Sequence, residues 1–142
     1  YELLPDQIAS HFNGSGVPNG WMAKSLFTVF MLAIGMGAPA FVIGIMYSIR
    51  FFPAKYLNVP NSPYWREPTN FRRACDFIFA SSLWFCSALL LWQSFLATLI
   101  VEANQVSPPH FDTGKAVLWT IPLLIFIVVW AIVLIARFFK TE

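Results

Sequence analysis

The feature that most constrains this chain is a set of three long apolar stretches without a single Asp, Glu, Lys, Arg or His: Ser25–Ile49, Phe77–Val101 and Ala116–Ala136. At about 1.5 Å of rise per residue, the first two would reach roughly 37 Å as α-helices and the third roughly 31 Å. Because the hydrocarbon core of a bilayer is about 30 Å thick, each stretch can span it alone. The sequence therefore predicts an all-α integral membrane protein with three transmembrane helices.

The composition excludes an ordinary soluble domain. Hydrophobic residues make up 58% of the chain and charged residues 11%, whereas soluble domains average about 25% charged residues. The formal net charge of +2 is small and scattered along the chain, so it does not indicate nucleic-acid binding. We therefore expect membrane lipids around the chain and no nucleic-acid partner.

The distribution of charge predicts the orientation in the membrane. The connection Arg50–Asp76 contains five basic and two acidic residues, and the tail 137–142 contains two basic residues and one acidic residue. The segments 1–24 and 102–115 each contain two acidic residues and one basic residue. Because cytoplasmic loops are enriched in Lys and Arg, we expect 50–76 and 137–142 in the cytoplasm and 1–24 and 102–115 outside. The chain, 1–142, would form a single membrane domain with its first residue on the extracytoplasmic side.

The leading segment predicts a short amphipathic helix lying on the outer membrane surface. Its apolar residues recur every four positions, at Leu4, Ile8 and Phe12, and Pro5 suits a first helical position. The run Asn13–Gly16 would end this helix. Trp21 and Lys24 would then sit at the headgroup layer before the first span.

Within the spans, a few residues predict irregularity or packing. Pro39 lacks a backbone donor and should kink the first span. Gly37 and Gly44 belong to pairs of small residues spaced four apart, which would let another helix approach closely. Gln93 is the polar residue of the second span that is most costly to expose to lipid, so we expect it at a helix contact.

The polar segments resemble a known family. The run Leu4-Pro5-Asp6-Gln7-Ile8-Ala9-Ser10-His11-Phe12-Asn13, continuing through Gly16 and Trp21 to Lys24, is similar to the signature of the bacterial membrane family called domain of unknown function 1648. Two further stretches resemble other family positions: Asn58-Val59-Pro60-Asn61 with Tyr64-Trp65, and Ala103-Asn104 with Pro108-Pro109. The chain departs from the family pattern at Ala9, which replaces a usual Pro, and at Asn19, which replaces a usual Asp.

The resemblance implies a location and several structural residues. It implies the bacterial cytoplasmic (inner) membrane. An outside residue 1 could follow removal of a signal peptide or a preceding membrane helix, and the resemblance favours a fourth helix upstream, because family members typically carry one there. We expect structural roles for Leu4, Pro5, Asp6, Ile8, His11, Gly16, Lys24, Asn58, Pro60, Tyr64 and Trp65, with Tyr64 and Trp65 anchoring their loop at the headgroups. The same domain forms the front part of immunity proteins against the sporulation-delaying toxin, but no activity is established for most of the family.

The two histidines, His11 and His110, are the candidate metal ligands. Both lie in segments expected outside, where Asp6, Glu102 and Asp112 could join them. A catalytic zinc needs about three protein ligands, and no spacing here fixes such a geometry. Structural roles are therefore favoured for both histidines. We find no motif for a catalytic residue or a cofactor.

These observations lead to one preferred function and two alternatives. We expect a non-catalytic multi-span membrane protein that acts by associating with other integral membrane subunits, as an accessory or structural subunit of a larger complex. The first alternative is a protective membrane protein of the toxin-immunity kind. The second is a metal-dependent enzyme or sensor on the outer face that uses His11 and His110.

Overall fold

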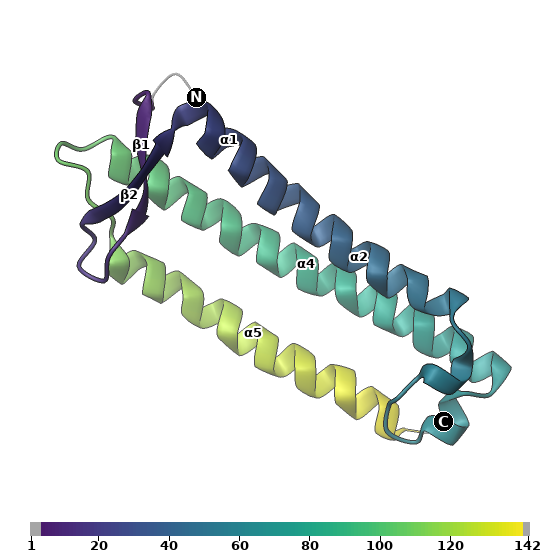
Figure 1. Ribbon diagram of the computed structural model, residues 1–142. Coiled ribbons are helices and arrows are strands. Elements are labelled where there is room, and N and C mark those ends of the chain that lie inside the picture. The colour runs from purple at the N-terminus through teal and green to yellow at the C-terminus, as the bar shows by residue number, and fades with distance from the viewer. Residues whose placement is uncertain (1–3, 141–142) are drawn as a thin grey trace. The chain divides into compact units, whose positions relative to one another are not determined.

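Three helical segments dominate the computed structural model, which describes residues 4–140 (Figure 1). By length and composition, Lys24–Phe51, Pro68–Asn104 and Thr113–Phe139 are long and apolar enough to cross a membrane. Each predicted span lies inside one of these segments, which is consistent with a membrane protein. Helix α4, Pro68–Asn104, has 37 residues and begins well before the apolar stretch. At about 55 Å it exceeds the hydrocarbon thickness, so its polar first turns belong outside the apolar layer.

The first of these segments is not one regular helix. It consists of α1 (Lys24–Leu32), a π-helical turn η1 (Ala33–Gly37), α2 (Ala38–Ser48) and a 3₁₀ turn η2 (Ile49–Phe51). The π-helical turn lies directly before Pro39, whose missing N–H and ring disturb the preceding turn. An irregularity therefore lies close to Pro39 as a π-helical turn, and the kink at Pro39 stays a prediction.

The predicted amphipathic helix in the leading segment is wrong. Strands β1 (Gln7–Phe12) and β2 (Pro18–Ala23) form an antiparallel hairpin instead. Their connection is closed by Asn13, whose Oδ1 accepts the N–H groups of Ser15 and Val17 at 3.0 Å each. Apolar spacing of four residues fits a strand face as well as a helix face, and the Asn-Gly-Ser-Gly run supplies the turn.

The connection before α4 is folded but contains only short helical turns. It contains a 3₁₀ turn η3 (Ala54–Tyr56) and the short helix α3 (Ser62–Trp65). Asn61 precedes α3 with a φ of 54°, a left-handed conformation that Asn tolerates better than most residues. The last long helix is α5, Thr113–Phe139.

The described residues cluster into two compact units, and α4 and α5 contribute one part to each. Unit 1 comprises the chain up to Ala38 together with Leu89–Leu123. Unit 2 comprises Pro39–Ala88 and the chain from Leu124. In unit 1 the buried apolar residues include Ile8, Ala9, Phe27, Leu99 and Ala103, and in unit 2 a core cluster forms from Leu57, Trp65, Ala74 and Phe138.

A tryptophan N–H joins α4 to α5 within each unit. In unit 1, Trp92 Nε1 donates to Thr120 Oγ1 at 3.1 Å. In unit 2, Trp130 Nε1 donates to the Ser81 carbonyl at 3.0 Å. Polar groups inside a bilayer need hydrogen-bond partners within the protein. Such bonds help to hold helices together there, because lipid tails are as apolar as the side chains and the hydrophobic effect does not favour helix–helix contact.

Candidate functional site

The hairpin of unit 1 is attached to the end of α4 by one side chain, Asn104. Its Oδ1 accepts the Ala9 N–H at 2.8 Å, and its Nδ2 donates to the Ala9 carbonyl at 2.9 Å. The same Nδ2 donates to the Ile100 carbonyl of its own helix at 2.8 Å. The amide thus pairs with the free side of β1 as a neighbouring strand would. Asn104 and Ala9 are both buried, so these hydrogen bonds have little competition from water.

The other end of the hairpin is held by the connection between α4 and α5. The N–H of Phe111 donates to the Gly16 carbonyl at 2.9 Å, and the rings of Phe12 and Phe111 stack with centroids 5.2 Å apart. Gly16 has a φ of 77°, and a Cβ there would lie 2.2 Å from the Phe111 carbonyl oxygen. Both its backbone conformation and this contact require glycine, which accounts for the predicted structural role of Gly16.

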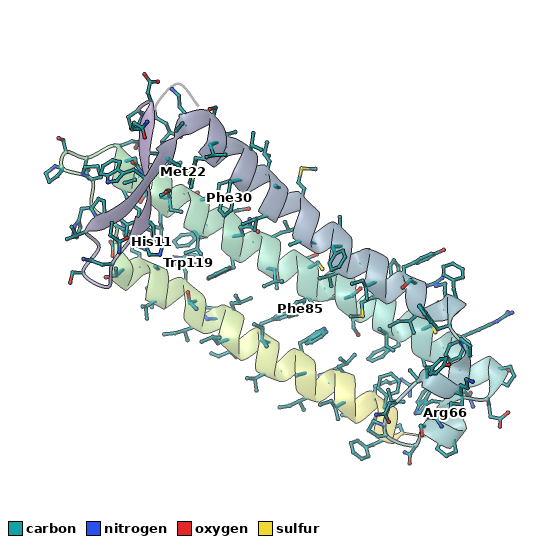
Figure 2. All side chains as sticks on the ribbon, viewed as in Figure 1. His11, Met22, Phe30, Arg66, Phe85 and Trp119 are labelled. Carbon is teal, nitrogen blue, oxygen red and sulfur yellow. The ribbon has the colours of Figure 1, made fainter. Side chains whose placement is uncertain are left out.

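Each histidine lies beside a glycine of the hairpin. His11 projects from β1 (Figure 2), and its Nδ1–H donates to Asn19 Oδ1. A Cβ on Gly20 would lie 2.9 Å from the His11 Cβ. The His110 ring packs over Gly16, and the His110 backbone N–H donates to the Ala103 carbonyl at 3.2 Å. Both histidines therefore make packing and hydrogen-bond contacts with the hairpin or with the end of α4.

The described residues do not gather a set of metal donors. Within residues 4–140, no three His, Cys, Asp or Glu side chains form a group that could hold a metal ion. One ring nitrogen of His11 is already engaged by the Asn19 amide oxygen. The geometry therefore adds no third ligand to His11 and His110, and metal binding by these two stays a prediction.

Lys24 ties the start of the hairpin to the start of α1. Its Nζ donates to the Leu4 carbonyl at 3.0 Å and lies 3.6 Å from Asp6 Oδ1, while its backbone N–H donates to the Asp6 carbonyl at 2.9 Å. Asp6 is fully exposed, so this ion pair adds little stability by itself. Pro5 is exposed between the two residues that Lys24 contacts.

Ile8, His11 and Gly16 thus belong to the hairpin. Lys24, the first residue of α1, joins the hairpin's start to the first long helix through Leu4 and Asp6. Residues 1–37 match the family model of the domain of unknown function DUF1648. This match confirms the predicted resemblance over the first 37 residues and covers the hairpin, α1 and η1. No curated protein and no solved structure matches the chain.

A groove in unit 1 is lined partly by residues of this matched segment. It has a volume of about 310 Å³ and is lined mainly by apolar side chains of α1 and α4, with Leu4 at one end. Its polar lining residues include Thr28 and Ser94, whose hydroxyls donate to carbonyls of their own helices. Gln93 also lines it, and within residues 4–140 its amide makes no hydrogen bond. An amide without a partner therefore lies in an apolar groove.

The small-residue contact in unit 1 occurs at a position that the sequence did not single out. A Cβ on Gly35 would lie 3.4 Å from Gln93 Nε2, so Gly35 lets α4 approach η1. A Cβ on Gly37 or Gly44 would meet no atom within 4 Å. The expected close packing at Gly37 and Gly44 is therefore not found within the described chain, and it stays a prediction for contact with another protein.

The loop residues singled out by the resemblance form a second polar attachment, in unit 2. Trp65 Nε1 donates to the Phe138 carbonyl at 3.0 Å, and Asn61 Nδ2 donates to the Phe139 carbonyl at 2.8 Å. Trp65 is 1% exposed, so the expected headgroup anchor is wrong for this residue, because its ring packs inside unit 2 against Tyr64 and Phe138.

The other predicted residues of this loop have smaller roles. Asn58 is exposed and makes no hydrogen bond within residues 4–140, and Pro60 is half-buried. Tyr64 is half-buried and accepts a hydrogen bond from Asn70 at its carbonyl. Sequence reasoning placed Asn61 and Asn104 in family-like stretches but assigned them no role. The partners that they hold in other segments lie 78 residues away for Asn61 and 95 for Asn104, so the neighbouring sequence carried no signal for these roles.

Proposed function

We propose that this protein is a non-catalytic multi-span membrane protein that acts by associating with other integral membrane proteins, as an accessory or structural subunit. The observation that carries the proposal is the Gln93 amide in the groove of unit 1. Gln93 lies four residues past the middle of the predicted span, about 6 Å along the helix, and therefore within the hydrocarbon layer. A polar group at that depth needs a hydrogen-bond partner.

A transmembrane helix of another protein suits this groove better than a lipid chain does. An acyl chain would fill the apolar part but would leave the Gln93 amide unpaired. A helix that carries a hydroxyl, an amide or a free carbonyl would satisfy it, and such polar contacts contribute about 0.6–2 kcal/mol between membrane helices. Exposed apolar side chains on the same two helices, among them Leu26, Phe30 and Leu91, would extend the contact.

The orientation of the chain is part of this proposal. We place the hairpin of unit 1 outside the bacterial cytoplasmic membrane and the C-terminus in the cytoplasm, because the basic residues are concentrated in 50–76 and in the tail. Fusions of alkaline phosphatase, which is active only outside the cytoplasm, test this orientation. A fusion at the C-terminus should be inactive, and an active one would reverse the assignment.

The association is tested by native mass spectrometry of the protein extracted gently from its own membranes. We expect other subunits in a fixed stoichiometry with the wild-type chain and their loss from the variant Gln93→Leu. The matched control is Ser87→Ala, which removes a hydroxyl that donates to its own helix at Leu83 and does not line the groove. A monomer or homo-oligomer in the wild type would refute the proposal and favour the toxin-immunity and metal-dependent alternatives.

A further inference from the structure

Unit 2 contains an open pocket of about 530 Å³ whose polar walls are mostly arginine. Arg50 follows α2, Arg66 follows α3 (Figure 2) and Arg72 lies in the second turn of α4. The acidic residue that lines the pocket is Asp76. Three guanidinium groups against one carboxylate leave an excess of positive charge in the pocket, which favours an anionic ligand.

Two of these arginines are held in place through contacts that leave other donors available. Arg66 Nε donates to the Leu57 carbonyl at 3.1 Å, and its terminal nitrogens make no hydrogen bond within residues 4–140. Arg50 Nε donates to the Tyr47 carbonyl at 3.2 Å, its guanidinium lies 4.0 Å from the Tyr47 ring centroid, and one terminal nitrogen is 3.6 Å from Asp76. A fixed guanidinium fork suits the oxygens of a phosphate group.

Arg72 supplies the donors that are least engaged. It is exposed, and within residues 4–140 its guanidinium makes no hydrogen bond or ion pair. Its position near the start of α4 also brings it close to the positive end of that helix dipole, which adds to the attraction for an anion.

The remaining walls are apolar and favour a ligand that has both a charged and an apolar part. Phe51 and Phe71 line the pocket, and Phe51 is 74% exposed. Phe52 and Tyr56 are exposed nearby in the same connection. Of these rings, Tyr56 is of the amphipathic kind that is enriched in the headgroup layer. A free phosphate ion would use the arginines but leave these aromatic walls uncovered.

We propose that this pocket binds the phosphate headgroup of an anionic glycerophospholipid. The phosphate oxygens accept hydrogen bonds from Arg66, Arg72 and the remaining terminal nitrogen of Arg50, and the acyl chains lie against Phe51 and Phe71. The proposal does not depend on the association of unit 1 with other subunits, since it uses residues of unit 2 alone.

The test is a titration of the purified full chain in neutral detergent with dioleoyl phosphatidylglycerol, read by native mass spectrometry. Dioleoyl phosphatidylcholine, whose headgroup has no net charge, provides the comparison. We expect phosphatidylglycerol to bind more tightly, and Arg72→Gln to weaken it by roughly threefold to tenfold, as expected from loss of one charge-assisted hydrogen bond at an exposed site. The matched control is Arg73→Gln, which removes one positive charge from the adjacent residue, and Arg73 does not line the pocket. It should change binding by less than twofold.

A second variant gives an effect of the opposite sign. Asp76→Asn removes the carboxylate that pairs with Arg50 and competes with the phosphate for its guanidinium. This variant should therefore bind phosphatidylglycerol more tightly, a gain that misfolding would not produce. Equal losses in Arg72→Gln and Arg73→Gln would show a general charge effect and overturn the site. Competition by inorganic phosphate at concentrations similar to those of the lipid would overturn the lipid assignment, because the aromatic walls would then contribute nothing.

Discussion

Replacing Asn104 with Leu should release β1 from the end of α4. The side chain satisfies both the N–H and the carbonyl of Ala9, at 2.8 and 2.9 Å, and Ala9 is 0% exposed. Leu branches at the same carbon as Asn but offers no donor or acceptor. A buried backbone group left without a partner costs about 1–3 kcal/mol, so losing both partners should cost about 2–6 kcal/mol.

The loss should appear locally before it appears in the unfolding of the whole chain. The hairpin is joined to the long helices by a few contacts, so it can open alone. Hydrogen exchange of the backbone amides in 7–12, measured in lipid nanodiscs, reports that opening. At 1.4 kcal/mol per factor of ten, the lower limit of the estimate corresponds to exchange about 30-fold faster than in the wild type.

Two further variants separate the hydrogen bonds from other effects. Asn58→Leu makes the same chemical change at an exposed Asn without a hydrogen bond in the described chain, and should leave exchange in 7–12 unchanged. Asn104→Asp keeps an acceptor for the Ala9 N–H but places a carboxylate against the carbonyls of Ala9 and Ile100, so it should also accelerate exchange. Exchange within threefold of the wild type in Asn104→Leu would refute the role assigned to this amide.

Two other predictions concern the ends of the same region. Gly16→Ala should destabilise unit 1 by more than about 1 kcal/mol in reversible unfolding by sodium dodecyl sulfate, because its φ of 77° and the nearby Phe111 carbonyl exclude a side chain, whereas Gly14→Ala, with open space around it, should be nearly neutral. The backbone N–H of Lys115 bonds the Asp112 carboxylate at 2.9 Å and lowers the pKa of Asp112 below its ordinary value. The cap that Asp112 provides for α5 should therefore be complete above the ordinary carboxyl pKa and lost as the pH falls through the lowered value, below about pH 4. As the pH falls through that range, hydrogen exchange at the first turn of α5 should accelerate in the wild type. The variant Asp112→Asn has no carboxyl group to protonate at this position, so the same acceleration with falling pH in this variant would contradict the assignment.

The long helices could be predicted because their signal is local. An uninterrupted apolar run long enough to cross a bilayer must satisfy its backbone within itself, and the helix does so residue by residue. The ends were harder to place. Helix α4 starts at Pro68, in a polar stretch with Arg72 and Arg73, because proline and polar residues are compatible with a first turn that lies outside the apolar layer. The π-helical turn before Pro39 likewise has a local cause, because proline disturbs the turn that precedes it.

The hairpin was missed because its apolar spacing is ambiguous. Leu4, Ile8 and Phe12 are four apart, which places them on one side of a helix and equally on one face of a strand, where every second residue points the same way. What decides between the two lies outside the segment. Ala9 lies in β1, and its backbone bonds the side chain of Asn104, 95 residues away. A helix in this segment would lose that contact, which no local pattern reveals.

The family-like stretches now have a common physical role. Asn104 holds the backbone of β1, while Asn61 and Trp65 hold the last carbonyls of α5 across separations of 73 to 78 residues. Such side chains fasten one segment to another and place no reactive group in a cavity. These three side chains therefore help to build the scaffold. The functional groups are better sought among the polar side chains that the scaffold leaves without partners. Gln93 in its groove and Arg72 in its pocket meet that description within the described chain, one among apolar side chains of long helices and one beside exposed aromatic rings. Each calls for a different class of ligand, a helix for the amide and an anionic headgroup for the guanidinium, so the two tests can succeed or fail separately.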